Sequence, residues 1–445
     1  MPAHTPPPLS ANGAANAHTN APPSTSAATA PRVAAMAARS VPPAVQAVAV
    51  GAAGALAAPD SGYHRRTMMR ARFAWCLLVV LIVAIVSSCG GGAAKTSTTG
   101  GGAAAGGAAP GTGGAGGHVP DAGPTCTVSD APYGAAVVAA ATCSATPPAG
   151  APAPPPPKAY SGGTCPALAA GMNDITSAGS PRSFLLALPA NLMPTEKLPV
   201  VFLWYWLKGS PEDFYTVGDV QAAVDQQRFI AVIPAAKGDL FYNWPFSVNE
   251  SQARLDEELT FFDDLLSCVS AGFNVNASCV SSVGVSAGAL FTDQLVGARS
   301  EYLSSFMSLS GGVVYDGATV ALLRPWTPPK HHVPALVLWG GPDDHCFFVE
   351  FQTASQVLEH DLQQGCDFVV ECVHNCGHSE PPFTAAEGLS TYAALWEFAL
   401  DHPYWLPAGT SPYTMQGLPP GMPSWCAIGA GKAVPRTGAC NGPGC

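Results

Sequence analysis

Short runs of β-branched and aromatic residues alternate with stretches of helical periodicity between about residues 180 and 400. Each run has the length and composition of a buried strand, and turn residues separate it from the next stretch. This alternation is typical of a mostly parallel central sheet with helices on both faces, so it predicts the α/β fold class. The predicted strands are Ser183–Leu188, Val200–Trp206, Phe229–Ile233, Cys279–Val283, Phe306–Leu309, Ala335–Trp339 and Phe368–Val373.

Helical periodicity is clearest over Glu250–Cys268. Within this stretch Leu255, Leu259 and Phe262 recur at helical spacing, so this face is expected in the core. Four more helices are predicted between the strands, over Val217–Gln227, Ala287–Arg299, Phe351–Leu362 and Ala385–Leu400.

Composition divides the chain of 445 residues. Up to about residue 160, Ala, Gly, Pro, Ser and Thr dominate, and such sequence buries too little apolar surface to offset its chain entropy. Aromatic and aliphatic residues rise together after that point, which predicts one folded domain over 159–408 and a Cys-rich tail over 409–445. The net charge is −11, with no basic cluster to follow a phosphate backbone, so nucleic acid is not an expected partner.

An export signal is predicted over residues 68–88. Arginines precede the apolar run Phe73–Val86, which is followed by Ser87-Ser88-Cys89. Fourteen residues span about 21 Å as a helix, against about 30 Å for a bilayer core, so a transmembrane span is the weaker interpretation. Small residues before a cysteine are typical of bacterial lipoproteins, so we expect secretion and a lipid anchor at Cys89 in the cell envelope. An ordinary signal peptide and a retained helix are the alternatives.

The lipoprotein interpretation also assigns the flanking segments. A signal peptide is read at an N-terminus, so residues 1–67 are interpreted as an extension from a misassigned start, with translation beginning at Met68 or Met69. Residues 89–158 are predicted to be a Gly/Ala/Pro-rich tether. The membrane is thus expected as a partner through the anchor only.

Cysteine usage agrees with export. Of 14 cysteines, Cys76 lies in the signal and Cys89 is the lipid site, which leaves an even number for disulfides. Cys268 and Cys279 are close enough in sequence to link a helix end to the next strand. Three more cysteines suggest a disulfide-bonded tail, and these are Cys426, Cys440 and Cys445.

Candidate chemistry begins at Gly284-Val285-Ser286-Ala287-Gly288, the only G-x-S-x-G of the chain. The motif follows a predicted strand and opens a predicted helix, which is the context of a nucleophile elbow. Ser286 is therefore the candidate nucleophile, and the N–H of Ala287 is a candidate donor to a developing oxyanion. An idle serine in a glycine-rich turn is the alternative.

The base and the acid are expected in the order serine, acid, histidine. The loop after the strand Ala335–Trp339 carries Asp343 and Asp344, and we predict Asp343 as the acid with Asp344 in reserve. His378, after Gly377, is the predicted base.

These residues identify a resemblance to the polyhydroxybutyrate depolymerase and feruloyl esterase-like group of α/β hydrolases, over about 179–404. It rests on the elbow, Arg182-Ser183-Phe184, Trp244, Leu309-Ser310-Gly311-Gly312, Gly340–Asp343, Gly377-His378 and Trp396-Glu397-Phe398 near His402-Pro403. The resemblance implies that 159–408 is an α/β-hydrolase catalytic domain. It also implies a serine carboxylesterase with the triad Ser286, Asp343 and His378.

One departure from the group lies after the strand that ends at Leu203. The group usually has a His-Gly pair there, whereas this chain has Tyr205 and Trp206. The N–H of Leu207 is then the candidate second oxyanion donor. Trp204, Tyr205 and Trp206 are expected either to shape an aromatic pocket or to pack in the core.

Cysteines lie close to the predicted base and acid. Cys376 precedes His378 by two residues and Cys346 follows Asp343 by three, so a disulfide between them is predicted, with Cys372 and Cys366 as alternative partners for Cys346. A zinc site in the Cys372–His378 loop is the competing interpretation, and it is disfavoured because ligands two residues apart fit a tetrahedral ion poorly.

The predicted function is hydrolysis of a carboxylic ester through an acyl-enzyme, with no cofactor and no metal. A polymeric ester is among the candidate substrates. A serine peptidase on the same fold is one alternative, because fold and triad do not choose between ester and amide. A non-catalytic surface lipoprotein that binds a polymer or glycan is the other. The sequence does not choose among hydroxybutyryl, feruloyl and acetyl esters.

Overall fold

The computed structural model describes residues 132–317, 322–440 and 445. All of them belong to the compact unit Thr112–Cys445. Four predictions fall outside the described residues. They concern the extension 1–67, the signal 68–88, the lipid site Cys89 and the tether up to residue 131. Within the described part of the chain, no helix has both the length and the apolarity needed to cross a membrane.

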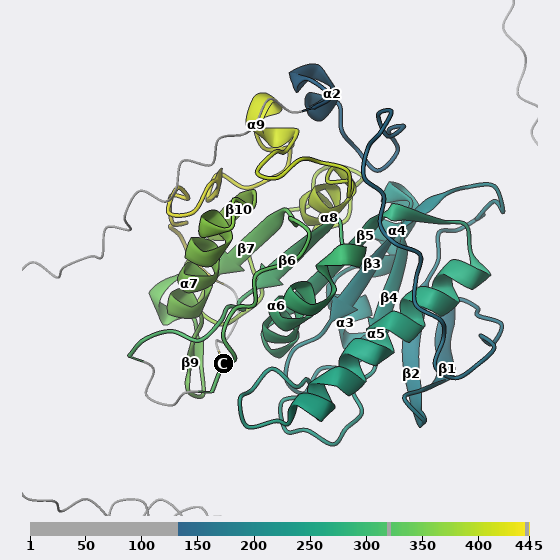
Figure 1. Cartoon of the computed structure of the whole chain (residues 1–445). Coiled ribbons are helices and arrows are strands. Elements are labelled where there is room, and N and C mark those ends of the chain that lie inside the picture. The colour runs from purple at the N-terminus through teal and green to yellow at the C-terminus, as the bar shows by residue number, and fades with distance from the viewer. Residues whose placement is uncertain (1–131, 318–321, 441–444) are drawn as a thin grey trace, which may run out of the picture. The chain divides into compact units, whose positions relative to one another are not determined.

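A nine-stranded sheet forms the centre of the domain (Figure 1). Its strands are β1 (Gly171–Ser177), β2 (Ser180–Ala187), β3 (Leu198–Trp204), β4 (Ile230–Pro234), β5 (Val275–Val285), β6 (Ser305–Leu309), β7 (Ala335–Trp339), β10 (Val369–Val373) and β11 (Cys426–Ile428). The order is β1-β2-β4-β3-β5-β6-β7-β10-β11. Pairing is parallel from β4 to β10 and antiparallel at both edges. A separate hairpin pairs β8 (His345–Cys346) with β9 (Val349–Glu350).

Helices cover both faces of the sheet. The helices of the described residues are α2 (Ala135–Ala139), α3 (Pro211–Val217), α4 (Val220–Gln227), α5 (Gln252–Gly272), α6 (Ala287–Arg299), α7 (Phe351–Gln364), α8 (Ala393–Leu400) and α9 (Tyr413–Gln416). Figure 1 shows α5, α6 and α7 in front of the sheet, with α3, α4 and α8 behind it. Strands β3, β4, β6, β7 and β10 are buried along their whole length, as expected of parallel strands covered on both sides.

The predicted mostly parallel α/β architecture is confirmed, and each predicted strand is present. The strand Ala335–Trp339 has the predicted bounds, and the bounds of the others are shifted. The sequence missed both edge strands β1 and β11, because partly exposed or short strands lack a continuous apolar run. Two helix predictions differ. The stretch Val217–Gln227 holds the end of α3 and all of α4, and the helix predicted from Ala385 begins only at Ala393, since Gly388 at a φ of 78° interrupts it.

The segment before residue 159 is part of the packed domain, which corrects the prediction that the tether extends to 158. Val138 and Ala141 are buried against Trp405 and Leu406. A disulfide joins Cys143 to Cys279.

The predicted Cys268–Cys279 link is also wrong, because Cys268 bonds Cys165. Each cysteine instead anchors a part of the N-terminal segment, which sequence spacing does not reveal.

A buried ion pair ties β2 to α5. Arg182 donates to Glu258 at 2.8 Å, with 4% and 0% of their side chains exposed, and its guanidinium lies 3.8 Å from the ring centre of Phe261. Glu258 also accepts from Arg254 at 2.7 Å. Burial removes water as an alternative partner, so loss of either charge leaves the other poorly solvated.

We therefore expect Arg182→Met to lower the free energy of unfolding by about 3 kcal/mol, measured by denaturant titration without reductant. Lys237→Met is the control, because Lys237 pairs with Glu257 at 3.0 Å while 30% and 40% of these side chains remain exposed. That loss should stay below about 1 kcal/mol. An equal loss of unfolding free energy in the two variants would contradict the claim that the buried ion pair contributes more to stability than the exposed one.

Candidate active site

Ser286 lies at the sharp turn between β5 and α6, where its φ is 55°. The two glycines of the motif are needed because backbones meet here. A Cβ on Gly284 would lie 2.2 Å from the carbonyl oxygen of Gly288, and a Cβ on Gly288 would lie 2.0 Å from that of Trp204. The start of α6 thus packs directly on the end of β3, and the turn presents the serine at the carboxyl edge of the sheet.

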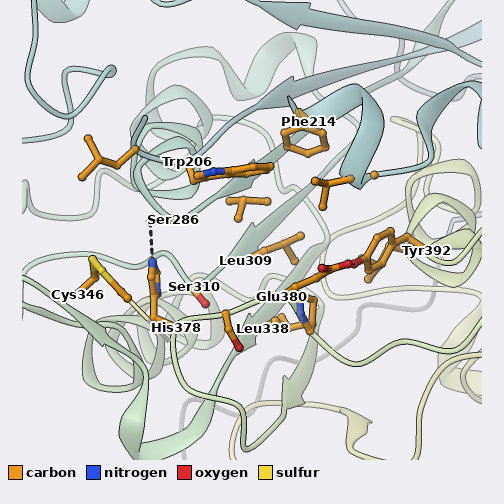
Figure 2. Close-up of a pocket in the computed structure, with 18 of the residues that line it drawn as sticks. Trp206, Phe214, Ser286, Leu309, Ser310, Leu338, Cys346, His378, Glu380 and Tyr392 are labelled. Carbon is orange, nitrogen blue, oxygen red and sulfur yellow. Dashed lines mark hydrogen bonds between the residues drawn. A yellow bond between two sulfur atoms is a disulfide. The ribbon is translucent and has the colours of Figure 1, made fainter. Parts of the chain in front are cut away.

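His378 faces this serine. The Oγ of Ser286 lies 2.8 Å from Nε2 of His378, within hydrogen-bond distance (Figure 2). The imidazole stacks on the ring of Phe351, the first residue of α7, with ring centres 4.3 Å apart and an angle of 17° between the planes. This contact limits rotation of the imidazole, so the ring stays directed at Ser286.

The carboxylate partner of His378 is Asp344. Its Oδ1 lies 2.7 Å from Nδ1 of His378. Its Oδ2 accepts from the hydroxyl of Ser310 at 2.8 Å and from the N–H of Gly340 at 2.7 Å. Asp344 is buried, so these donors fix the direction of its carboxylate.

The choice of Asp343 as the acid is corrected by this geometry. Asp343 is exposed at the end of the 3-10 helix Gly341–Asp343, and the chain turns Asp344 inward immediately after it. Gly341 adopts a φ of 80° in this turn. Two adjacent aspartates after a strand look equivalent in sequence, and only the turn decides which one points into the site.

The loops that carry Asp344 and His378 lie side by side, as expected. The N–H of Gly377 donates to the carbonyl of Gly340 at 3.0 Å. A Cβ on Gly340 would lie 1.9 Å from the carbonyl oxygen of Gly377, so this approach requires glycine. His374 in turn donates its N–H to the carbonyl of Trp339 at 3.0 Å.

The disulfide predicted between these two loops is wrong. Each loop is bonded instead to the C-terminal tail, through Cys346–Cys445 and Cys376–Cys440, and Cys372 of β10 is bonded to Cys426. The prediction of a disulfide-bonded tail is confirmed. The tail replaces a direct link because β11 pairs with β10 and brings the chain end to the site.

These disulfides also occupy the thiols of the zinc alternative. The remaining histidine of that loop, His374, is buried, and burial lowers its pKa to about 4. Its Nδ1 accepts from the N–H of Cys376 at 3.1 Å. Among the residues that the structure describes, no group of three His, Cys, Asp or Glu side chains has the arrangement of a metal site.

Two backbone N–H groups are candidates for contact with a bound carbonyl oxygen. Ala287 is the first residue of α6, and no hydrogen bond from its N–H is found in the described part of the chain. Leu207 lines the same pocket as Ser286, and its N–H likewise has no acceptor among the described residues. Both groups are therefore available to a bound carbonyl oxygen.

Ser286 and His378 line a cavity of about 510 Å³ with mainly apolar walls (Figure 2). Trp206 and Phe214 form one side, with ring centres 6.0 Å apart, and Leu309, Leu338 and Leu395 contribute apolar surface elsewhere.

The three aromatics of the altered loop therefore divide between the pocket and the core. Trp206 lines the pocket, whereas Trp204 and Tyr205 are buried. The Tyr205 hydroxyl accepts from the N–H of Ala236 at 2.7 Å, and burial raises the pKa of this phenol to about 12.

Two supporting residues were not predicted. Ser310 adopts a φ of 51° directly after β6 and donates to Asp344, and Phe351 stacks on His378. Ser310 belongs to the Leu309–Gly312 motif, so its place at a strand end was the available signal. The following turn is held by Asp293, which accepts from Gly312 at 2.7 Å; burial raises the pKa of Asp293 to about 8.

Comparison with known proteins supports the architecture. No family model and no curated protein matches the chain. A cysteine variant of pOPH in complex with DMSO is similar at 16% identity and a TM-score of 0.50, over 62% of this chain and 98% of that one. Native sOPH is similar at 16% identity and a TM-score of 0.49, over 60% of this chain and 98% of that one.

An acetyl xylan esterase from Aspergillus awamori is similar at 14% identity and a TM-score of 0.32, over 42% of this chain and 78% of that one. At these identities a likeness shows shared fold, and it does not by itself transfer an activity. Together with the sheet order and the turn at Ser286, the likeness to pOPH shows that the domain has the α/β-hydrolase fold.

Proposed function

We propose that the protein is a serine hydrolase of carboxylic esters, with Ser286 as nucleophile, His378 as base and Asp344 as the acid that orients the base. The observation that carries this proposal is the continuous hydrogen-bonded series from Ser286 through His378 to Asp344. Nucleophile, base and orienting group are each within hydrogen-bond distance of the next, and the nucleophile opens on a cavity.

In the proposed mechanism, Nε2 of His378 accepts the Ser286 proton as Oγ attacks the ester carbonyl. The carbonyl oxygen becomes an oxyanion, which the N–H groups of Ala287 and Leu207 stabilise. Protonated His378 then gives its proton to the leaving alcohol, and an acyl-enzyme forms. Water, activated by the same imidazole, releases the acid. Asp344 orients the imidazole and stabilises the imidazolium each time it forms.

An ester is favoured over a peptide as substrate by the cavity. Its walls are mainly aliphatic and aromatic, which suits an apolar acyl or aryl group and offers few partners to a peptide backbone. The resemblance found in the sequence adds that the acyl group is of hydroxyalkanoate, feruloyl or acetyl type.

We further propose export and lipid anchoring at Cys89. The described residues contain five disulfides. Disulfides form and persist in an oxidising compartment outside the cytoplasm, so they support export. The anchor itself rests on the sequence before Cys89.

Replacement of the nucleophile tests the proposed function. Ser286→Ala should abolish labelling by a fluorophosphonate probe and lower kcat on p-nitrophenyl esters by about 10⁶, since removal of the nucleophile removes the acyl-enzyme route. Ser144→Ala is the control and should keep wild-type activity, because Ser144 is exposed, does not line the cavity, and its hydroxyl bonds that of Thr142. Esterase activity of Ser286→Ala equal to that of the wild type would refute the assignment.

The two adjacent aspartates give a matched pair. Asp344→Asn should lower kcat by up to ~10⁴, because the amide no longer holds His378 in the tautomer that accepts the serine proton. Asp343→Asn removes the same charge one residue earlier, at an exposed position, and kcat should stay within about twofold of wild type. The reverse result would reinstate Asp343 as the acid.

The disulfide Cys376–Cys440 allows a test of whether the tail positions His378. It links the tail to Cys376, two residues before His378. The double variant Cys376→Ala/Cys440→Ala should lower kcat by ~10- to 10²-fold, because small displacements of a base are costly. Cys165→Ala/Cys268→Ala removes a disulfide on α5 and serves as control. At a temperature where near-UV circular dichroism shows both variants folded, an equal kcat for the two would argue against positioning by the tail.

A further inference from the structure

One end of the cavity is polar. Glu380 and Tyr392 both line it, and Figure 2 shows them at the end away from Ser286. The Tyr392 hydroxyl donates a hydrogen bond to Oε1 of Glu380. Because Glu380 follows His378 by two residues, the loop that carries the proposed base also brings this carboxylate into the cavity.

Tyr392 holds the carboxylate in place. Its side chain is buried, with 6% of the residue exposed, and its ring contacts Phe383 edge-on at 5.6 Å between centres. Burial and the neighbouring Glu380 raise the pKa of Tyr392, so the phenol keeps its proton. Since a phenol has a single proton to donate, Tyr392 is committed to Glu380 and fixes the position of Oε1.

The second oxygen of Glu380 is available to a ligand. In the described part of the chain, Oε2 accepts no hydrogen bond, and no Lys, Arg or His nitrogen lies within 4.0 Å of the carboxylate. Glu380 is exposed, so this oxygen is not sealed beneath other side chains. A carboxylate oxygen between apolar walls accepts strongly from any donor that a ligand brings.

Charge decides which donor fits. An anionic group is repelled by Glu380. Lys208 also lines this cavity and has no ion-pair partner among the described residues, so a cationic group is attracted by one charged side chain and repelled by the other. A neutral hydroxyl meets neither penalty and donates one hydrogen bond to the free oxygen.

We propose that Glu380, positioned by Tyr392, is a specificity-determining residue that binds a hydroxyl group of the substrate at a distance from the scissile ester bond. The substrate class is then an ester whose pocket-filling chain is apolar along its length and hydroxylated towards its end. That the substrate is an ester rests on the proposed function. That it carries a hydroxyl group rests on the cavity alone.

Matched p-nitrophenyl esters test the proposal. Unsubstituted straight-chain acids of six to ten carbons are compared with their ω-hydroxy, ω-amino and ω-carboxy counterparts. The wild type should prefer the ω-hydroxy ester at the chain length that reaches Glu380. In Glu380→Gln the ratio of kcat/KM for the ω-hydroxy ester to kcat/KM for the unsubstituted ester should fall about tenfold, because the charged acceptor is lost.

Two further variants sharpen the result. Tyr392→Phe frees the carboxylate to move, so the KM for the ω-hydroxy ester should rise more than its kcat falls. Glu212→Gln removes the same charge from an exposed position on α3 outside the cavity, and the ratio should stay at the wild-type value. An unchanged ratio in Glu380→Gln, or a preference for the ω-amino ester, would overturn the proposal.

Binding without turnover separates the two proposals. Ser286→Ala is titrated calorimetrically with ω-hydroxy and unsubstituted fatty amides, with and without Glu380→Gln. Tighter binding of the ω-hydroxy amide that disappears with Glu380→Gln supports the inference even if the wild type cleaves no ester. Equal binding of both amides contradicts it even if ester hydrolysis at Ser286 is demonstrated.

Discussion

Direct backbone contact, too close for any side chain, is the constraint on which the site depends. A Cβ at Gly284, Gly288 or Gly340 would lie 1.9 to 2.2 Å from a neighbouring carbonyl oxygen. These contacts hold the end of β3 against α6 and the loop of Asp344 against the loop of His378. Any larger residue would separate these loops, and the short distances among Ser286, His378 and Asp344 could not persist.

The tail adds a second, covalent constraint to this arrangement. Strand β11 extends the sheet beyond β10, and the disulfides Cys372–Cys426 and Cys376–Cys440 then fix the chain on both sides of His374. His374 is buried, and burial lowers its pKa to about 4. The loop that carries His378 is thus held by strand β11, by the backbone contact between Gly340 and Gly377, and by two disulfides. Its conformation is therefore strongly restricted.

Sequence reasoning reached the parts of this structure that local patterns encode. The buried strands appear as largely apolar runs, and the elbow at Ser286 has a motif whose glycines are required by local geometry. It failed where the outcome depends on a turn or on distant segments. The choice between Asp343 and Asp344 is made by the 3-10 turn at Gly341. The disulfide partners of Cys346 and Cys376 lie 99 and 64 residues away, beyond any local pattern.

The polar end of the cavity is a further consequence of how the base is delivered. A loop that projects His378 towards Ser286 also carries the next residues into the cavity, and one of them is a carboxylate. Glu380 is exposed, so water solvates its carboxylate in the free protein. Tyr392 supplies one hydrogen bond from a buried phenol and leaves the second oxygen to water or to a ligand. A substrate chain that displaces this water must bring a donor of its own to keep the carboxylate solvated, so the proposed selectivity would come from the same loop that provides the proposed base.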